Sequence, residues 1–134
     1  MRLSAGDGWF RYATPAPGVL HVVVAGHDRG QFGTATLDEI RHEILRHQPL
    51  ELFVDASQAL SISPSVSEAW TRFFSQDRAK LSRVSVLVGS KAISLTVAIA
   101  QHLSRTGNLI QIYTDRELFE ARLRAAEQRR TRPG

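Results

Sequence analysis

The chain contains no cysteine, which excludes disulfide bonds, thiolate zinc sites and cysteine nucleophiles. It also has no apolar run long enough to span a membrane, and its first nine residues lack the apolar segment of a signal peptide. We therefore expect a soluble, cytoplasmic protein. Metal-ligand spacing is missing as well, because His42 and His47 are five residues apart rather than four. We expect no metal and no cofactor.

Positive charge is concentrated at the end of the chain. The 134 residues include 17 Lys and Arg against 13 Asp and Glu, a formal net charge of +4. Five arginines but only one glutamate lie between Arg122 and Gly134, so residues 1–121 hold 12 charges of each sign. This distribution does not favour a nucleic-acid-binding protein. We expect one domain over residues 1–123, followed by a basic tail over residues 124–134 that is frayed or disordered and that the fold can lose.

Short β-rich runs alternate with segments of helical periodicity. Strands are expected at Trp9–Ala13, Val19–Ala25, Leu50–Val54, Val84–Val88 and Leu109–Tyr113. The first two strands form a hairpin, because the prolines and the glycine of Thr14–Gly18 predict a turn. The whole order predicts an α/β fold, a single-domain mixed sheet of about five strands with four helices. Right-handed crossovers would connect its parallel strands.

Three of the four helices begin at a Ser or Thr followed three residues later by Glu. This capping-box pattern predicts Thr36, Ser65 and Thr114 as the helix caps. The fourth helix is expected from about Lys91 to Arg105. Polar loops are expected before the first two helices, at residues 26–33 and 56–64.

The ends of two strands carry most of the candidate site residues. His27, Asp28 and Arg29 follow the second strand, at a position where α/β proteins often bind ligands. They fit a solvated loop or a polar contact to a partner. Asp55 and Ser57 follow the third strand. We assign Asp55 to accepting loop N–H groups, with a nucleophile or metal ligand as the alternative, and Ser57 to the partner surface.

An enzyme that used both aspartates would need them within hydrogen-bond reach of each other. No nucleophile elbow, paired-carboxylate motif or phosphate loop accompanies Asp28 or Asp55. We therefore assign no catalytic residue and expect a protein that is not an enzyme.

Ser63-Pro64-Ser65 stands before the second helix. One interpretation makes Ser65 the helix cap, with Pro64 fixing the entry of the chain. The other makes Ser63 or Ser65 a phosphoacceptor, because the positive end of a helix tolerates a phosphate. The helix that follows carries Trp70, which is expected either in the core or at a partner surface, and two phenylalanines.

The helix from Lys91 to Arg105 is apolar around much of its circumference. The residues responsible are Ile93, Leu95, Val97, Ala98, Ile99 and Leu103. Such a helix is either sandwiched within the fold or covered by another chain.

Two stretches resemble the STAS domain family of sulfate transporters and anti-sigma-factor antagonists, in particular its diverged antagonist-like branch. Gly26-His27-Asp28 followed by Thr34–Leu37 is similar to the family's Gly-x-x-Asp, small residues and helix. Leu52–Ser57 is similar to its strand end of apolar residues, Asp, apolar residue and Ser. The order of elements agrees from about Val19 to Leu123.

The resemblance implies a non-catalytic regulatory or scaffolding module of bacterial signalling. Its partner would be an anti-sigma-type kinase, another signalling complex or a second copy in a homodimer. One departure concerns the phosphorylated Asp-Ser-Ser/Thr-Gly motif of switching members, where this chain has Ser61–Val66 without the Asp or the Gly. The alternative is a small-molecule or lipid carrier, since this branch resembles CRAL-TRIO lipid carriers in outline and Trp70 could line an apolar pocket.

Overall fold

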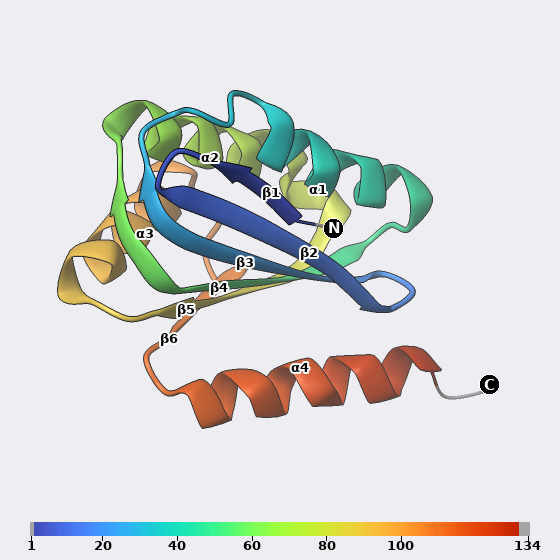
Figure 1. Cartoon of the computed structure of the whole chain (residues 1–134). Helices are drawn as coiled ribbons and strands as arrows, with labels where there is room; N and C mark the ends of the chain where they lie inside the picture. Colours follow the sequence, from blue (N-terminus) through green and yellow to red (C-terminus); the bar gives the residue numbers. More distant parts are fainter. Residues whose placement is uncertain (1, 132–134) are drawn as a thin grey trace.

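A six-stranded mixed sheet forms the centre of the protein (Figure 1). The computed structural model describes residues 2–131. The strands are β1 (Arg2–Ala5), β2 (Gly8–Ala16), β3 (Val19–Asp28), β4 (Leu50–Ile62), β5 (Leu81–Val88) and β6 (Ile110–Tyr113). They lie side by side in chain order; β1, β2 and β3 pair antiparallel, and β3 to β6 pair parallel.

Three helices cover one face of the sheet and a fourth covers the other (Figure 1). They are α1 (Ala35–Arg46), α2 (Pro64–Asp77), α3 (Lys91–Leu103) and α4 (Arg116–Thr131), with a short 3₁₀ turn at Arg78–Lys80. Because the parallel strands follow one another in order, right-handed crossovers place α1, α2 and α3 on the same side. Among the helices of residues 2–131, only α4, which follows the last strand, reaches the opposite face.

The alternation of side chains along the strands divides the core into two parts. On the three-helix side, Val22 and Val24 of β3 pack with Ile40 of α1 and Phe73 of α2. On the other side, Phe53 of β4 packs with Phe119 and Ala126 of α4 and with Leu87 of β5. The mixed α/β sheet with four helices confirms the predicted fold class.

The sheet has one strand more than the five expected. The additional strand, β1, pairs with β2 through a two-residue turn at Gly6-Asp7, where Gly6 has a φ of +59°. Gly-Asp between two short runs is a recognised hairpin signal. The sequence of Arg2–Ala5 nevertheless lacks the β-branched side chains that are typical of a strand. In the structure, half of these residues are exposed.

The expected loop at residues 56–64 is wrong, because β4 continues to Ile62. β5 pairs with β4 only as far as Ala56, and beyond that point β3 alone pairs with it, ending at Asp28 opposite Ile62. An edge ribbon of this kind tolerates the polar residues that are otherwise typical of a loop. In the same way β2 extends to Ala16, so the turn is confined to Pro17-Gly18.

The expected capping residues are wrong by one or two positions in all three helices. α1 begins after Thr34 and α2 after Ser63, whose side-chain oxygen accepts a hydrogen bond from the Val66 amide. Asp115 precedes α4, and its carboxylate accepts from the Glu117 amide at 2.9 Å. The residue before each helix is polar, although Thr34, unlike Ser63 and Asp115, makes no capping hydrogen bond with its side chain.

The expected frayed tail is largely helical. α4 continues without interruption from Arg116 to Thr131, and Ala126 within it is fully buried. Arg129 forms an ion pair of 3.1 Å with the buried Glu51. The last three residues of the predicted tail, 132–134, lie outside the described residues.

Replacing Ser63 by Ala is expected to destabilise the protein by about 1 kcal/mol, because the Val66 amide loses its acceptor. Ser65→Ala, the matched control at an exposed position two residues later, is expected to cost only a few tenths of that. Urea denaturation of the two variants and the wild type measures both losses. A larger loss for Ser65→Ala would return the capping role to Ser65.

Candidate functional site

The carboxyl ends of β3 and β4 form one continuous surface. The imidazole Nδ1 of His27 lies 2.7 Å from the hydroxyl of Ser61, and the Ser63 amide donates to the Asp28 carbonyl at 2.9 Å. We name this surface the β3–β4 edge and define it as residues 27–31 and 61–65. The edge brings together two polar segments that are more than thirty residues apart in the chain.

Arg29 is the exposed cation of the β3–β4 edge. Its guanidinium donates to the Asp7 carboxylate in the β1–β2 turn at 2.6 Å. This hydrogen bond holds the pKa of Asp7 below its usual range. Both side chains are more than half exposed, so the pair adds little to stability and remains available to a partner.

Asp28 is buried rather than exposed on the edge. One carboxylate oxygen accepts from the Gly30 amide at 3.1 Å. Burial raises the pKa of this carboxyl above its ordinary value, although the hydrogen bond from Gly30 opposes the rise. The side chain lines a cavity under the edge and is not part of the outer surface.

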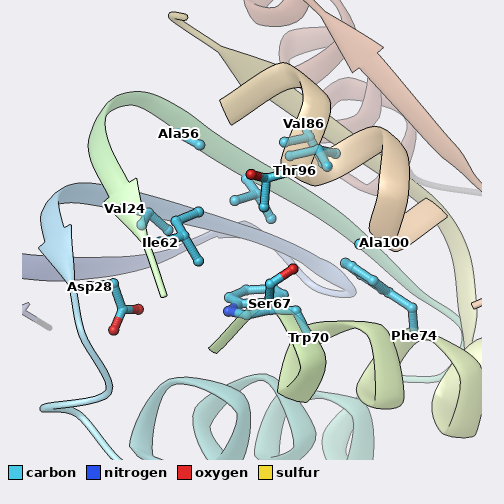
Figure 2. A pocket seen from close by; sticks show the side chains of 12 residues that line it. Val24, Asp28, Ala56, Ile62, Ser67, Trp70, Phe74, Val86, Thr96 and Ala100 are labelled. Carbon is cyan, nitrogen blue, oxygen red and sulfur yellow. The ribbon is translucent and has the colours of Figure 1, made fainter. Parts of the chain in front are cut away.

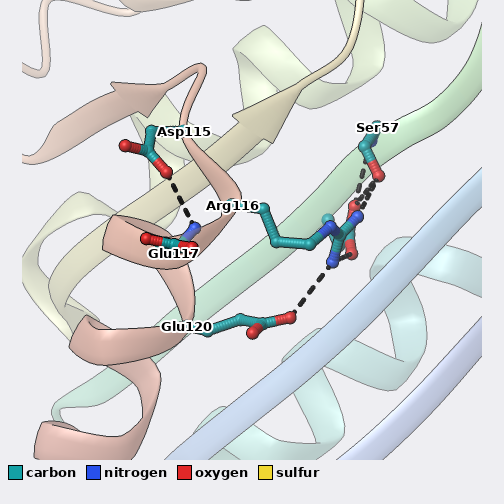
Figure 3. A network of polar contacts seen from close by, with 6 residues as sticks. Ser57, Asp115, Arg116, Glu117 and Glu120 are labelled. Atoms are coloured by element: carbon teal, nitrogen blue, oxygen red, sulfur yellow. Dashed lines mark hydrogen bonds and ion pairs between the residues drawn. The ribbon is translucent and has the colours of Figure 1, made fainter.

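A second polar cluster lies on the α4 side of the sheet. Asp55 accepts from both the amide and the hydroxyl of Ser57, at 3.0 and 2.6 Å. Arg116, at the start of α4, donates to Asp55 at 3.2 Å and to the Ser57 hydroxyl at 2.6 Å. Figure 3 shows the guanidinium reaching Ser57 on one side and Glu120 on the other.

The charge of Asp55 is stabilised within this cluster. Burial raises the pKa of the Asp55 carboxyl, but the hydrogen bonds from Ser57 and the charge of Arg116 outweigh burial and leave the pKa below its ordinary value. The Ser57 amide that Asp55 accepts belongs to β4 itself and not to a loop. Asp55 therefore joins α4 to the middle of β4, and the contacts of this cluster favour its charged form.

The two aspartates lie on opposite faces of the sheet. Asp28 pairs with Ile62 and lines the cavity on the three-helix side, whereas Asp55 pairs with Val23 and contacts α4. They do not converge within hydrogen-bond reach, so they cannot act as a pair of carboxylates. Within residues 2–131 there is also no group of three His, Asp or Glu side chains placed to hold a metal ion.

A small apolar cavity of about 60 Å³ lies between the sheet, α2 and α3 (Figure 2). Trp70 and Phe74 of α2 line it together with Val97 and Ala100 of α3, and Asp28 lies at its margin. Phe73, the other phenylalanine of α2, is fully buried in the core. The partly buried Trp70 thus faces the cavity, and its ring contacts Phe74 with centroids 5.8 Å apart.

His21 is a half-buried titratable group under α4. Its Nε2 is enclosed and has no hydrogen-bond partner among the described residues, and its ring lies 6.2 Å from that of Phe119. Burial lowers the pKa of His21 below its ordinary value, against the nearby charge of Asp55, which raises it. The neutral imidazole is therefore the form that the fold favours.

The stability of the protein is expected to fall on acidification because of His21. The folded-state pKa is lower than the unfolded value of about 6.5, so the unfolded chain binds the proton first and stability decreases as the pH falls below that value. His21→Leu removes this titratable group and should make the stability less dependent on pH. Thermal unfolding of both proteins between neutral pH and about pH 5 compares them. Parallel curves would contradict the assignment.

The five residues predicted to bind a partner are not brought together. His27 and Arg29 lie on the β3–β4 edge, but Asp28 and Trp70 line the cavity beneath it. Ser57 is held by Arg116 on the other face. Ser63 and Ser65, the predicted phosphoacceptors, do lie on the edge, with their hydroxyls 3.2 Å apart.

The fold is similar to that of a solved structure. It is the crystal structure of an uncharacterized protein of the DUF3478 family from Shewanella loihica PV-4, which is described as having a SpoIIAA-like fold. The TM-score is 0.62 at 10% sequence identity, over 90% of this chain and 98% of the other. The fold is SpoIIAA-like. The resemblance to STAS domains is thereby confirmed for the fold. No family model matches the sequence, and no curated protein matches it.

A SpoIIAA-like fold does not by itself assign a partner or a ligand. The described helices include none that is long and apolar enough to cross a membrane. Arg116, which the sequence showed only as part of a capping pattern, is the polar residue that prediction missed. Its contact with Asp55 spans 61 positions, and no local pattern reports a contact of that range.

Proposed function

We propose that the protein is a non-catalytic regulatory or scaffolding module whose partner protein binds at the β3–β4 edge. The observation that supports this proposal is the joining of the two segments by the His27–Ser61 and Asp28–Ser63 contacts. These contacts hold exposed polar groups on a rigid sheet end, where a partner meets a preformed surface. The resemblance to STAS domains names the partner class, an anti-sigma-type kinase or another signalling complex.

Charge reversal at the edge tests the proposal. Arg29→Glu should abolish recovery of a partner from an extract of the source cells, because it inverts the exposed charge of the edge. Arg46→Glu is the matched control: Arg46 is an exposed arginine with a single glutamate partner, at the far end of α1. Equal recovery by both variants would contradict the proposal.

A phosphate on Ser65 is the regulatory step that we propose for this edge. Ser65 is exposed in the first turn of α2, where free N–H groups and the helix dipole favour a negative charge. Ser65→Asp should change the partners recovered, whereas Ser65→Ala should not. Mass spectrometry of the protein from its native cells provides the direct measurement. Unmodified Ser63 and Ser65 under all growth conditions would rule the switch out.

The cavity between α2 and α3 favours a second function, the binding of a small apolar molecule. Its lining is apolar apart from Asp28, Ser67 and Thr96, but its 60 Å³ is well below the roughly 150 Å³ that holds benzene in a dry cavity. An acyl chain would require α2 and α3 to separate. Native mass spectrometry of freshly purified protein distinguishes the functions, since a retained ligand mass supports the carrier.

A further inference from the structure

The outer face of α3 is apolar and exposed. Leu95, Ile99 and Leu103 are 62%, 47% and 63% exposed and follow one another at intervals of four residues. Residues four apart lie on the same side of a helix, so the three side chains form one row. Ala92 and Ala98 beside the row are also exposed. We name this surface the α3 row.

The opposite side of α3 already fulfils its role in the core. Ile93 and Ala100 are buried against the sheet. An apolar helix is either sandwiched within the fold or covered by another chain. Burial within the fold accounts for Ile93 and Ala100 but not for the α3 row. The other strongly exposed leucines, among them Leu45 and Leu60, occur singly, and isolated apolar residues are ordinary on a protein surface.

The α3 row contains almost no charge. Between Lys91 and Arg105 the only titratable residue is His102, and the helix has no acidic residue. Charged groups normally select one heterologous partner over another by complementarity and repulsion. The row has no such group at its centre, which favours recognition by an equally uncharged surface.

We propose that the α3 row is an interface with a second copy of this chain, paired antiparallel about a two-fold axis at Ile99. The row reads Leu, Ile, Leu at equal spacing and is therefore the same in both directions. Antiparallel pairing places Ile99 on its counterpart and Leu95 against Leu103 of the second copy. An isologous contact requires this self-complementarity. Two rows of four-residue spacing interdigitate when helices cross at about −50°.

The size of the row predicts a weak dimer. Its three large side chains expose roughly 300 Å² of apolar surface, at the lower end of the largest patches found on monomers. Two copies would bury less than the roughly 1,200 Å² that marks the smallest stable interfaces, so we expect a Kd in the micromolar range. Antiparallel pairing brings Lys91 near Arg105 of the second copy, where the two positive charges repel weakly, and added salt should therefore tighten the dimer.

Sedimentation equilibrium of the purified full chain, over a hundredfold range around micromolar concentration, tests the pairing. Wild type should change from monomer to dimer, and Ile99→Glu should remain monomeric because it places two carboxylates at the axis. Leu45→Glu, the same kind of change at an exposed leucine of α1, should leave dimerisation unchanged. A wild-type protein that stays monomeric throughout, or a dimer insensitive to Ile99→Glu, overturns the proposal.

A double variant tests the antiparallel register. Leu95→Glu alone should weaken the dimer at least tenfold. Leu95→Glu combined with Leu103→Lys should restore it, because each glutamate then faces a lysine of the second copy. This rescued dimer should weaken in salt, the reverse of wild type. Circular dichroism checks that both variants remain folded. Failure of the double variant to recover overturns the register.

The inference is independent of the proposed partner at the β3–β4 edge. Arg29→Glu should abolish partner recovery and leave the dimer intact, whereas Ile99→Glu should do the opposite. If wild type is monomeric and Ile99→Glu loses partner binding, the α3 row binds a different protein and self-association is refuted. A wild-type dimer that weakens in salt would contradict pairing through the uncharged α3 row.

Discussion

Deletion of residues 124–134 is expected to lower the free energy of unfolding by about 2–4 kcal/mol. The basic composition of the segment indicates the opposite, namely a tail that can be removed without affecting the fold. Arg129 is the ion-pair partner of Glu51, whose side chain is only 7% exposed, and Ala126 is fully buried. The deletion leaves a buried carboxylate without a cation and uncovers part of the α4-side core.

The loss is large because, in the part of the chain that the structure describes, α4 is the one helix on its face of the sheet. Phe119 and Ala126 are its buried apolar residues, and they lie two turns apart along the helix. Cutting after Leu123 removes one of these two contacts. The Arg130 guanidinium, which donates to the Pro49 carbonyl at 3.3 Å, is removed as well. The shortened helix then has too few turns and contacts to remain docked.

Deletion of residues 132–134 alone is the matched control and should change stability by less than about 0.5 kcal/mol. Arg129→Met separates the ion pair from the rest of the segment, because it keeps most of the side-chain packing and removes the charge. Chemical denaturation measures all three proteins. Equal unfolding midpoints for wild type and the longer deletion would show that the segment is dispensable after all.

The elements of the core follow from local patterns in the sequence. The apolar runs at Leu50–Val54 and Val84–Val88 are buried on both sides, as parallel strands must be when helices cover both faces. Their order then determines which face each helix covers, because crossovers are right-handed. Periodicity and handedness are therefore enough to predict the fold class. They are not enough to predict where β4 ends, because its last six residues depend on pairing with β3 alone.

The candidate site could be predicted only in part. Sequence placed His27 and Ser63 at strand ends, and parallel pairing made these ends adjacent. It could not show that Asp28 turns inward or that Asp55 is held by Arg116 from a distant helix. Asp28 was expected in a loop, but β3 continues to it, and alternation along the strand then places it on the same face as Val22 and Val24. The contact between Asp55 and Arg116 joins distant parts of the chain, and no local pattern records it.

The same limit applies to α3. Its composition indicated an apolar helix but could not decide between burial inside the fold and contact with another chain. The decision required the sheet, which contacts only one side of the helix and leaves Leu95, Ile99 and Leu103 exposed. Composition identifies a surface that needs a partner, and three-dimensional structure shows whether the chain itself supplies one.

Gly26→Ala is expected to destabilise the protein by about 3 kcal/mol or more. Gly26 has a φ of +76°, in the region that favours glycine, and a Cβ at this position would overlap the Asp7 carbonyl oxygen. That carbonyl also accepts the His27 amide at 3.2 Å, so the clash displaces the turn that anchors the β3–β4 edge. Partner recovery should therefore decrease together with stability.

Gly33→Ala separates the two causes. Gly33 has a φ of +58°, but no atom lies within 4 Å of the position that a Cβ would take, so the variant loses only the cost of the backbone conformation, about 1 kcal/mol. The difference between the two variants, measured by urea denaturation, is the contribution of the contact between Gly26 and the β1–β2 turn. If the two losses are equal, the turn moves freely and does not hold the edge. If Gly26→Ala costs more, the N-terminal hairpin determines the position of His27 and Arg29.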